Sequence, residues 1–228
     1  MRRARPRQVR PAGARPAGLW APRWRALLAG LVLTITLVAF EALAVVTILP
    51  VVARDLDGLR LYGWVTSAFF LGTVVGIVVA GEQADRHGPA PPFVLGLALF
   101  AGGLAVSGLA PSMAVLVVGR GLQGLGAGAI PAIAYVSIGR TFPEALRPRV
   151  FAVLSTAWVV PGAVGPALSA LVAEHAGWRP VFLGLLPLVG VAGALTARAL
   201  RRIGPPERAA GGGRRLPAAL RVSAGAGA

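Results

Sequence analysis

The chain has 228 residues, of which 56% are hydrophobic and only 14% are charged, and it contains no cysteine. Soluble domains usually carry about a quarter of their residues as charges, so this composition favours a membrane protein. Without cysteine, a disulfide framework within the chain is excluded.

The net charge of +15 comes from arginine alone, because lysine is absent. The arginines lie at both ends of the chain and in short gaps between apolar stretches. A nucleic-acid-binding domain instead gathers its basic residues on one face or stripe, so we expect no nucleic-acid partner. A cleavable signal peptide is not expected either, because the first apolar stretch is too long and others follow it.

Six apolar stretches are each about as long as the ~20-residue helix that crosses the hydrocarbon of a bilayer. In chain order they are approximately 27–50, 62–80, 92–110, 113–138, 150–173 and 180–198. Helix is the expected state, because open strands would leave backbone groups unpaired in lipid and the stretches lack the alternation of barrel strands. The sequence therefore predicts an all-α polytopic membrane protein, with a six-helix transmembrane bundle over residues 26–200.

The two ends of the chain are a basic arm at residues 1–25 and a basic tail rich in Gly, Pro and Ala at residues 201–228. Both are predicted to be disordered. Nineteen of the 23 arginines lie on the side of the two termini and three in the other gaps. By the positive-inside rule, this predicts a multi-pass protein of the cell (plasma or inner) membrane with both termini in the cytoplasm.

Two charged residues of opposite sign lie deep inside the apolar stretches, Glu41 in the first and Arg120 in the fourth. We expect Arg120 to lie ~12 Å below the outer end of its helix and Glu41 at nearly the same depth. A charge inside a membrane is costly unless it is paired or faces water. Two interpretations follow: a structural ion pair that joins two helices, or a titratable carboxylate and an arginine in a hydrated substrate cavity. Gln123, on the same helical face as Arg120, either binds substrate or satisfies a neighbouring group.

Small residues recur every four positions in two of the stretches. They are Gly72, Gly76 and Ala80 in the second stretch, and Gly124 and Gly128 in the fourth. This spacing lets helix backbones approach closely, so these residues are predicted to lie at helix-packing contacts.

The fifth stretch contains Pro161, Gly162, Gly165 and Pro166 within six residues. The prolines remove backbone donors and the glycines remove side-chain support, so this segment predicts a helix bend. The bend either only shapes the bundle or marks a point about which parts of the protein move.

The gap GEQADRHG at residues 81–88 places charged residues between Gly81 and Gly88 and predicts a tight inner loop. A carboxylate is stabilised at a helix N-terminus, so Asp85 is a candidate cap for the helix that follows.

Together these segments resemble the major facilitator superfamily, and within it the drug:proton antiporters. The gap 81–88 is similar to the family's signature loop, although Gln83 stands where leucine is usual. The stretch GRGLQGLGAG resembles the fourth-helix motif of proton-coupled members, and FEALAVVTILPVVARDL resembles the first-helix motif, with Glu41 at the usual aspartate. PGAVGPALSA resembles the fifth-helix antiporter motif, with Ser169 and Ala170 in place of a glycine pair, and GWRPVFLGLLPL resembles the start of the sixth helix.

This resemblance implies a role for each group of residues. It implies that Arg120 and Gln123 take part in proton coupling and line a substrate cavity, and that Glu41 is protonated and deprotonated in the transport cycle. It implies a conformational gate formed by Gly81, Asp85, Arg86 and Gly88, and a functional bend formed by Pro161, Gly162, Gly165 and Pro166.

The implied function is proton-coupled export of hydrophobic or cationic compounds, that is, drug:proton antiport. The partners would be the lipid bilayer, a small-molecule substrate and protons. The proton gradient would supply the energy, so we expect neither a cofactor nor a metal.

The family binds substrate between two six-helix halves, and this sequence contains one such set of stretches. We therefore expect an N-terminal half that needs a second six-helix half. The alternatives are a non-transporting or regulatory membrane module, or a major facilitator transporter for another small-molecule cargo. A membrane-embedded enzyme is not expected, because the sequence has only His87 and His175, both predicted in loops, no GxSxG motif and no metal-ligand cluster.

Overall fold

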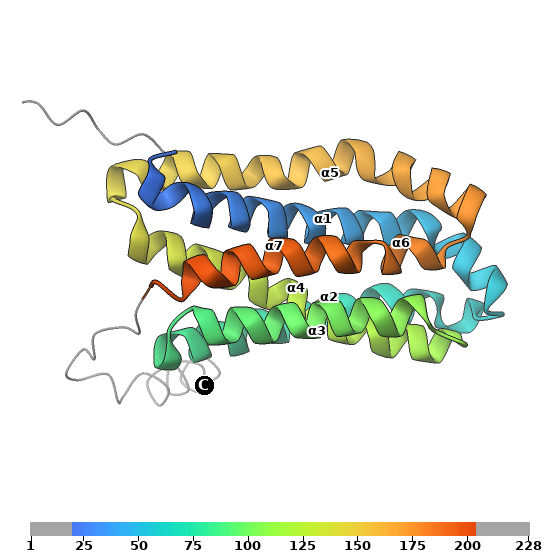
Figure 1. Ribbon diagram of the computed structural model, residues 1–228. Coiled ribbons are helices and arrows are strands. Elements are labelled where there is room, and N and C mark those ends of the chain that lie inside the picture. The colour runs from blue at the N-terminus through green and yellow to red at the C-terminus, as the bar shows by residue number, and fades with distance from the viewer. Residues whose placement is uncertain (1–19, 204–228) are drawn as a thin grey trace, which may run out of the picture.

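The computed structural model of the chain describes residues 20–203 (Figure 1). Most of the predicted basic arm and tail, residues 1–19 and 204–228, lies outside these described residues. Within the described range the chain is almost entirely helical and contains no strand. Six helical segments there are long and apolar enough to cross a membrane. The prediction of an all-α protein with six transmembrane helices is confirmed.

Residues 20–203 form seven α-helices and two short 3-10 helices. The α-helices are α1 (Pro22–Asp55), α2 (Tyr62–His87), α3 (Ala90–Gly108), α4 (Met113–Thr141), α5 (Arg147–Ala176), α6 (Arg179–Leu183) and α7 (Leu185–Leu200). The 3-10 helices are Leu59–Leu61 before α2 and Glu144–Leu146 before α5. Helices α6 and α7 together form the sixth candidate span, Arg179–Leu200.

The sixth span is interrupted at Gly184, which the sequence analysis did not predict. Proline has no backbone N–H, so Pro187 cannot donate the usual helical bond to the carbonyl of Leu183. Gly184 adds no side chain to stabilise the turn, although its N–H still makes the ordinary helical bond to the carbonyl of Pro180 at 2.9 Å. The result is a short helix α6 followed by α7 within one span.

The predicted loop at residues 81–88 is instead mostly helical, because α2 continues to His87. An ion pair between Glu82 and Arg86, one turn apart, supports these last turns. The helix ends at Gly88, whose φ of 84° lies in the region that only glycine adopts readily. The prediction of Asp85 as an N-terminal cap is wrong: Asp85 lies inside α2, and Pro89 precedes α3 without a side-chain cap.

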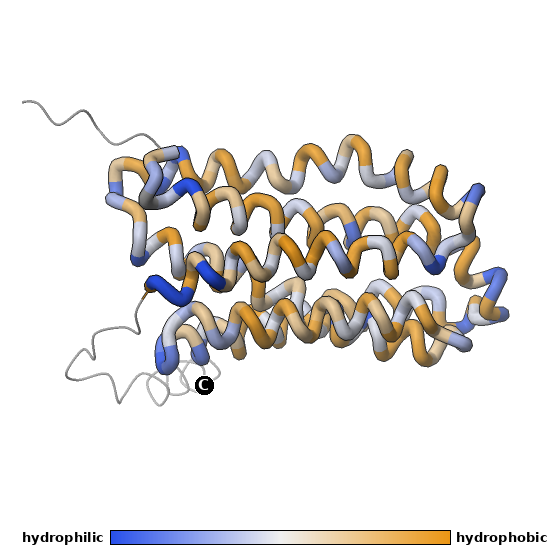
Figure 2. The backbone as a smooth tube through the Cα atoms, viewed as in Figure 1, coloured by the Kyte–Doolittle hydropathy of each residue, from blue (hydrophilic) through white to orange (hydrophobic). Residues whose placement is uncertain are grey.

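The six spans pack as two groups of three (Figure 1). In one group α4 packs between α2 and α3, and in the other α1 packs between α5 and α7. Contacts of α3 with α6 and α7 join the groups. Figure 2 shows hydrophilic residues gathered at the two ends of the bundle and apolar residues along its length. This distribution is the one that a multi-pass membrane protein requires.

Glycines bring the backbones of α2 and α4 into direct contact. A Cβ atom added to Gly72 would lie 2.5 Å from the carbonyl oxygen of Gly121. Added Cβ atoms on Gly76, Gly124 and Gly128 would also clash with backbone atoms of the facing helix. The four glycines singled out from the sequence therefore all lie at the seam between these helices, where only a hydrogen atom fits.

We expect Gly124→Ala to destabilise the bundle by about 1–3 kcal/mol, because its methyl group would meet the carbonyl of Phe69 and force the two helices apart. The matched control is Gly121→Ala on the same helix, where an added Cβ meets nothing within 4 Å. The control should not be destabilised, since alanine favours helix over glycine. Urea unfolding of the full chain in detergent, followed by circular dichroism, measures both. Equal effects of the two substitutions would contradict the packing role.

Candidate functional site

Glu41 of α1 and Arg120 of α4 meet inside the bundle. Arg120 Nη1 donates a hydrogen bond to Glu41 Oε1, and the two side chains form an ion pair. The side chain of Glu41 is 1% exposed and that of Arg120 is 2% exposed. The structure thus brings together the two intramembrane charges that the sequence singled out, and it encloses them in the conformation described.

Gln123 completes the cluster from the next turn of α4. Its Nε2 donates to Glu41 Oε1 at 3.0 Å, and its Oε1 accepts a hydrogen bond from Arg120 Nη1 at 3.1 Å. The same Oε1 accepts from Ser107 Oγ of α3 at 3.3 Å. Both ends of the Gln123 amide are therefore engaged by neighbouring side chains in this conformation.

Two members of the cluster were missed in the sequence. Phe69 of α2 lies beneath the guanidinium, with Arg120 Cζ 4.1 Å from the ring centroid, a cation–π contact. Ser107 of α3 reaches Gln123. A hydroxyl in the apolar third stretch was a weak signal for Ser107. Nothing distinguished Phe69, because aromatic residues are common in membrane helices.

The ion pair leaves two polar atoms without hydrogen bonds. Glu41 Oε2 and Arg120 Nε are buried and have no hydrogen-bond partner within residues 20–203. A buried charge pair is stable only when its remaining donors and acceptors are satisfied. In this conformation Glu41 Oε2 therefore remains an unused acceptor, and Arg120 Nε an unused donor.

The predicted gate residues separate into different environments. Asp85 near the end of α2 forms an ion pair with Arg140 of α4, with Arg140 Nη2 3.4 Å from Asp85 Oδ1. Arg140 also donates to the carbonyl of Ala84 at 3.3 Å. Arg86 forms an ion pair with Glu82 on its own helix. Of the two charged residues predicted in the gate, only Asp85 therefore links two helices.

The glycines of the predicted gate differ from each other as well. An added Cβ on Gly81 would meet no atom within 4 Å among the described residues, so no packing contact restricts that position to glycine. Gly88 adopts a positive φ where α2 ends. Gly88 therefore has a conformational reason to be glycine, and Gly81 has none in this structure.

The predicted bend lies within a continuous helix. Helix α5 runs through both Pro161 and Pro166 without interruption. Its ribbon is curved in Figure 1. The prolines lack the N–H groups that would bond to the carbonyls four residues earlier, which permits this curvature. Pro161 and Gly165 face the bundle, with Gly165 against Phe40 of α1, whereas Gly162 is exposed.

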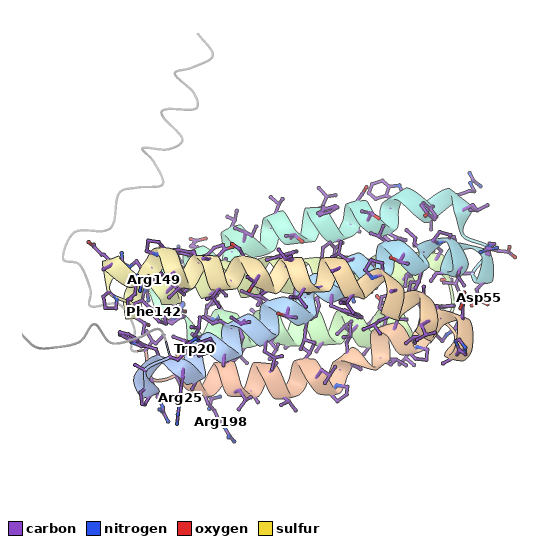
Figure 3. All side chains as sticks on the ribbon, turned by 90° about the horizontal axis from the view of Figure 1, so that it is seen from above. Trp20, Arg25, Asp55, Phe142, Arg149 and Arg198 are labelled. Carbon is purple, nitrogen blue, oxygen red and sulfur yellow. The ribbon has the colours of Figure 1, made fainter. Side chains whose placement is uncertain are left out.

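A second polar cluster, also missed in the sequence, lies at the opposite end of the bundle from Arg25, Arg149 and Arg198 (Figure 3). Asp55 Oδ2 accepts a hydrogen bond from Trp178 Nε1 at 2.9 Å and one from Arg179 Nη1 at 3.4 Å. Arg179 Nη2 also donates to the carbonyl of Ala110, 3.3 Å away. These contacts fasten the end of α1 and the segment after α3 to the start of α6.

Within residues 20–203, six apolar helical spans enclose a buried charge cluster, which is the architecture of a multi-pass membrane protein. Residues 17–225 match the family model of the Major Facilitator Superfamily. The chain belongs to this superfamily, and the family resemblance found in the sequence is confirmed. It is therefore related to transporters and not to membrane-embedded enzymes.

Several curated proteins resemble the chain. It is 35% identical over 155 residues, 68% of this chain and 33% of the relative, to a probable multidrug-efflux transporter of Mycobacterium tuberculosis (strain CDC 1551 / Oshkosh). It is 30% identical over 175 residues to the multidrug transporter protein MdtP of Bacillus subtilis (strain 168), covering 77% of this chain and 32% of that protein. The match to the multidrug resistance protein Stp of M. tuberculosis is 34% over 157 residues, 67% of this chain and 29% of the relative. The matched part of the chain spans about a third of the length of these relatives.

A double-mutant cycle tests whether the two buried charges stabilise each other. Glu41→Leu or Arg120→Leu alone should lower the free energy of unfolding by about 3–5 kcal/mol, since each leaves an unpaired buried charge. The double substitution should cost much less than the sum, because no charge is left buried. Urea unfolding of the full chain in detergent provides the four values.

The exposed pair Glu82 and Arg86 supplies the control cycle, with alanine at each position. Both side chains are more than half exposed. Solvent screens such a pair, so the two alanine substitutions should add without measurable coupling. Additive losses at Glu41 and Arg120 as well would show that these two residues do not act as a pair.

Proposed function

We propose that the chain is one six-helix half of a proton-coupled exporter that expels hydrophobic or cationic compounds in exchange for protons. The single observation that carries the proposal is the enclosed cluster of Glu41, Arg120 and Gln123. A carboxylate and a guanidinium inside a membrane bundle are costly for a purely structural purpose, and in membrane proteins such groups mark proton and substrate pathways.

The arrangement of the cluster suggests how a proton could be coupled to movement. Protonation of Glu41 at Oε2 removes its charge and leaves Arg120 without a counter-ion in a low-dielectric surrounding. An unpaired buried cation is unfavourable, so the protonated state favours a rearrangement that exposes Arg120 to water or to another partner. Loss of the proton restores the pair. Proton binding and conformation are then linked through the same two side chains.

The names of the relatives and one cavity support the proposed cargo. The three relatives described above are named multidrug transporters or resistance proteins. A cavity of about 380 Å³ between α1, α4 and α5 is lined by Tyr135, Phe151 and Trp158. The rings of Tyr135 and Phe151 lie 5.6 Å apart between centroids. Aromatic faces attract both hydrophobic and cationic groups, which suits such compounds.

A second six-helix half and a cytoplasmic position of both termini belong to this proposal. The exposed apolar side chains of α2 and α5, such as Val74, Val78, Val160 and Val164, offer surface for either lipid or a second half. Arg25, Arg149 and Arg198 project at the same end of the bundle (Figure 3). The positive-inside rule then puts that end in the cytoplasm of a cell-membrane protein.

The ion pair between Asp85 and Arg140 is the proposed gate contact. It ties the end of α2 to the end of α4 at the arginine-rich end of the bundle. A partly exposed pair of this kind is weak enough to break during a transport cycle. Asp85 would form the ion pair that breaks during the cycle, whereas Arg86 would stay paired within α2.

Glu41→Gln tests proton coupling, because glutamine keeps the shape and hydrogen-bonding capacity but cannot exchange a proton. The sharpest experiment places this chain in the Bacillus subtilis relative, in place of the matching segment, and measures ethidium export from vesicles driven by a pH gradient. We expect at least a tenfold loss with Glu41→Gln and retained activity with Glu41→Asp, since the aspartate still titrates.

Glu174→Gln is the matched control, because Glu174 is an exposed carboxylate of α5 outside the cluster. It should leave export unchanged. If Glu41→Gln exports as fast as the parent protein under the same pH gradient, the proposed coupling is wrong. If the parent chimera moves ethidium without any response to the pH gradient, the exporter is not proton-driven.

Asp85→Asn tests the gate in the same chimera. Because Asp85 would act on the conformational step and not on the cargo, we expect kcat to fall several-fold with KM little changed. Glu82→Gln is the control on the same face of α2, since Glu82 pairs only within its own helix. Equal effects of both substitutions, or an effect of Asp85→Asn on KM alone, would contradict the gate.

A further inference from the structure

A cavity of about 380 Å³ lies at the arginine-rich end of the bundle, between the start of α1, the end of α4 and the end of α7. The proposed transport mechanism uses none of its residues. Its lining comprises Arg198 of α7, Arg202 just after α7, Trp24 and Leu27 of α1, and Thr141 of α4. From this combination we infer that the cavity binds the headgroup of an anionic phospholipid.

No carboxylate of residues 20–203 neutralises the positive charge of the cavity. Arg198 lies in the last turn of α7 and Arg202 lies two residues beyond its end. Neither takes part in an ion pair with a carboxylate of residues 20–203. The negative end of the α7 dipole stabilises arginines at this position in general. That effect does not explain why two of them line a cavity. An anionic ligand would neutralise both.

The chemistry of the wall suits a phosphate group. Thr141 Oγ1 is buried and has no hydrogen-bond partner among the described residues. A phosphate oxygen would accept a hydrogen bond from this hydroxyl, and guanidinium groups bind phosphate through charge-assisted hydrogen bonds. Two arginines and the residue with this unpartnered hydroxyl therefore belong to the lining of one cavity.

The rest of the cavity favours a lipid over a soluble phosphate. Trp24 packs against Phe142 with ring centroids 5.2 Å apart, and Leu27 and Leu195 add apolar surface. In chain order the lining changes from Leu195 to Arg198 in α7, and then to Arg202 just after the helix ends. An apolar surface below two cations matches an acyl chain below its phosphate, at the level where tryptophan marks the membrane interface.

The chain itself is a poor alternative occupant. Residues 204–228, which follow α7, contain Arg208, Arg214, Arg215 and Arg221 against one acidic residue, Glu207. This segment carries net positive charge, so the two arginines of the cavity would repel it. Anionic lipids are attracted to basic groups at a membrane surface. The inference does not depend on proton coupling or on which side of the membrane this end faces.

Quenching of Trp24 by brominated lipids tests the inference on the full chain in vesicles. Brominated phosphatidylglycerol is compared with brominated phosphatidylcholine, and the same chain with Trp24→Phe is the blank that subtracts the other tryptophans. We expect a preference for phosphatidylglycerol of about fivefold or more at Trp24. Arg198→Gln with Arg202→Gln should reduce the ratio to about one, while quenching by phosphatidylcholine persists and shows that the variant remains folded and inserted.

Arg149→Gln is the control for Arg198→Gln alone, since each removes one positive charge and Arg149 is exposed at the same end of the bundle but does not line this cavity (Figure 3). It should leave the preference unchanged. Three results would overturn the inference: no preference in the parent chain, an equal loss of preference with Arg149→Gln, or full competition by millimolar glycerol phosphate. The second would indicate general surface charge, and the third a site for soluble phosphates.

Discussion

The requirement to pair opposite charges inside a membrane constrains the whole bundle. An isolated Glu41 or Arg120 would cost several kcal/mol in hydrocarbon, so α1 and α4 must turn these side chains towards each other. The pair fixes the rotation of both helices about their axes. Phe69 and Gln123 then pack around the guanidinium from the remaining directions. The other spans pack around these helices, and both charged side chains are buried as a result.

Much of the architecture was predictable because membrane helices follow from composition. Length and apolarity were enough for the six spans, and the opposite signs and similar depth of Glu41 and Arg120 were enough to suggest their contact. The spacing of Gly72, Gly76, Gly124 and Gly128 pointed to the seam where the structure places them. These signals are strong because lipid leaves few alternatives: a helix must span, a charge must be compensated, and close helices need small residues.

Other features were not predictable from the sequence. They depend on where a helix ends or breaks, or on contacts between residues far apart in the chain. The segment after residue 80 contains charges, and charge alone does not distinguish a loop from a helix that extends into water; its i,i+4 pair favours the helix. The interruption at Gly184 reflects Pro187, which cannot donate a hydrogen bond to the carbonyl of the neighbouring Leu183. The contacts of Asp55 with Trp178 and Arg179 join residues more than 120 positions apart. Sequence order gives no indication of such a contact.

The glycine contacts of α4 have a mechanical consequence. Direct contact between two helix backbones allows little sliding, so we expect α2 and α4 to move as a single rigid body. Gly103 of α3 approaches Gly119 of α4 as closely, which adds α3 to the same rigid body. Helix α1 belongs to the other group of three. Glu41 and Arg120 therefore stand on opposite sides of the boundary between two stiff units. Their ion pair therefore joins the two units across that boundary, inside the bundle.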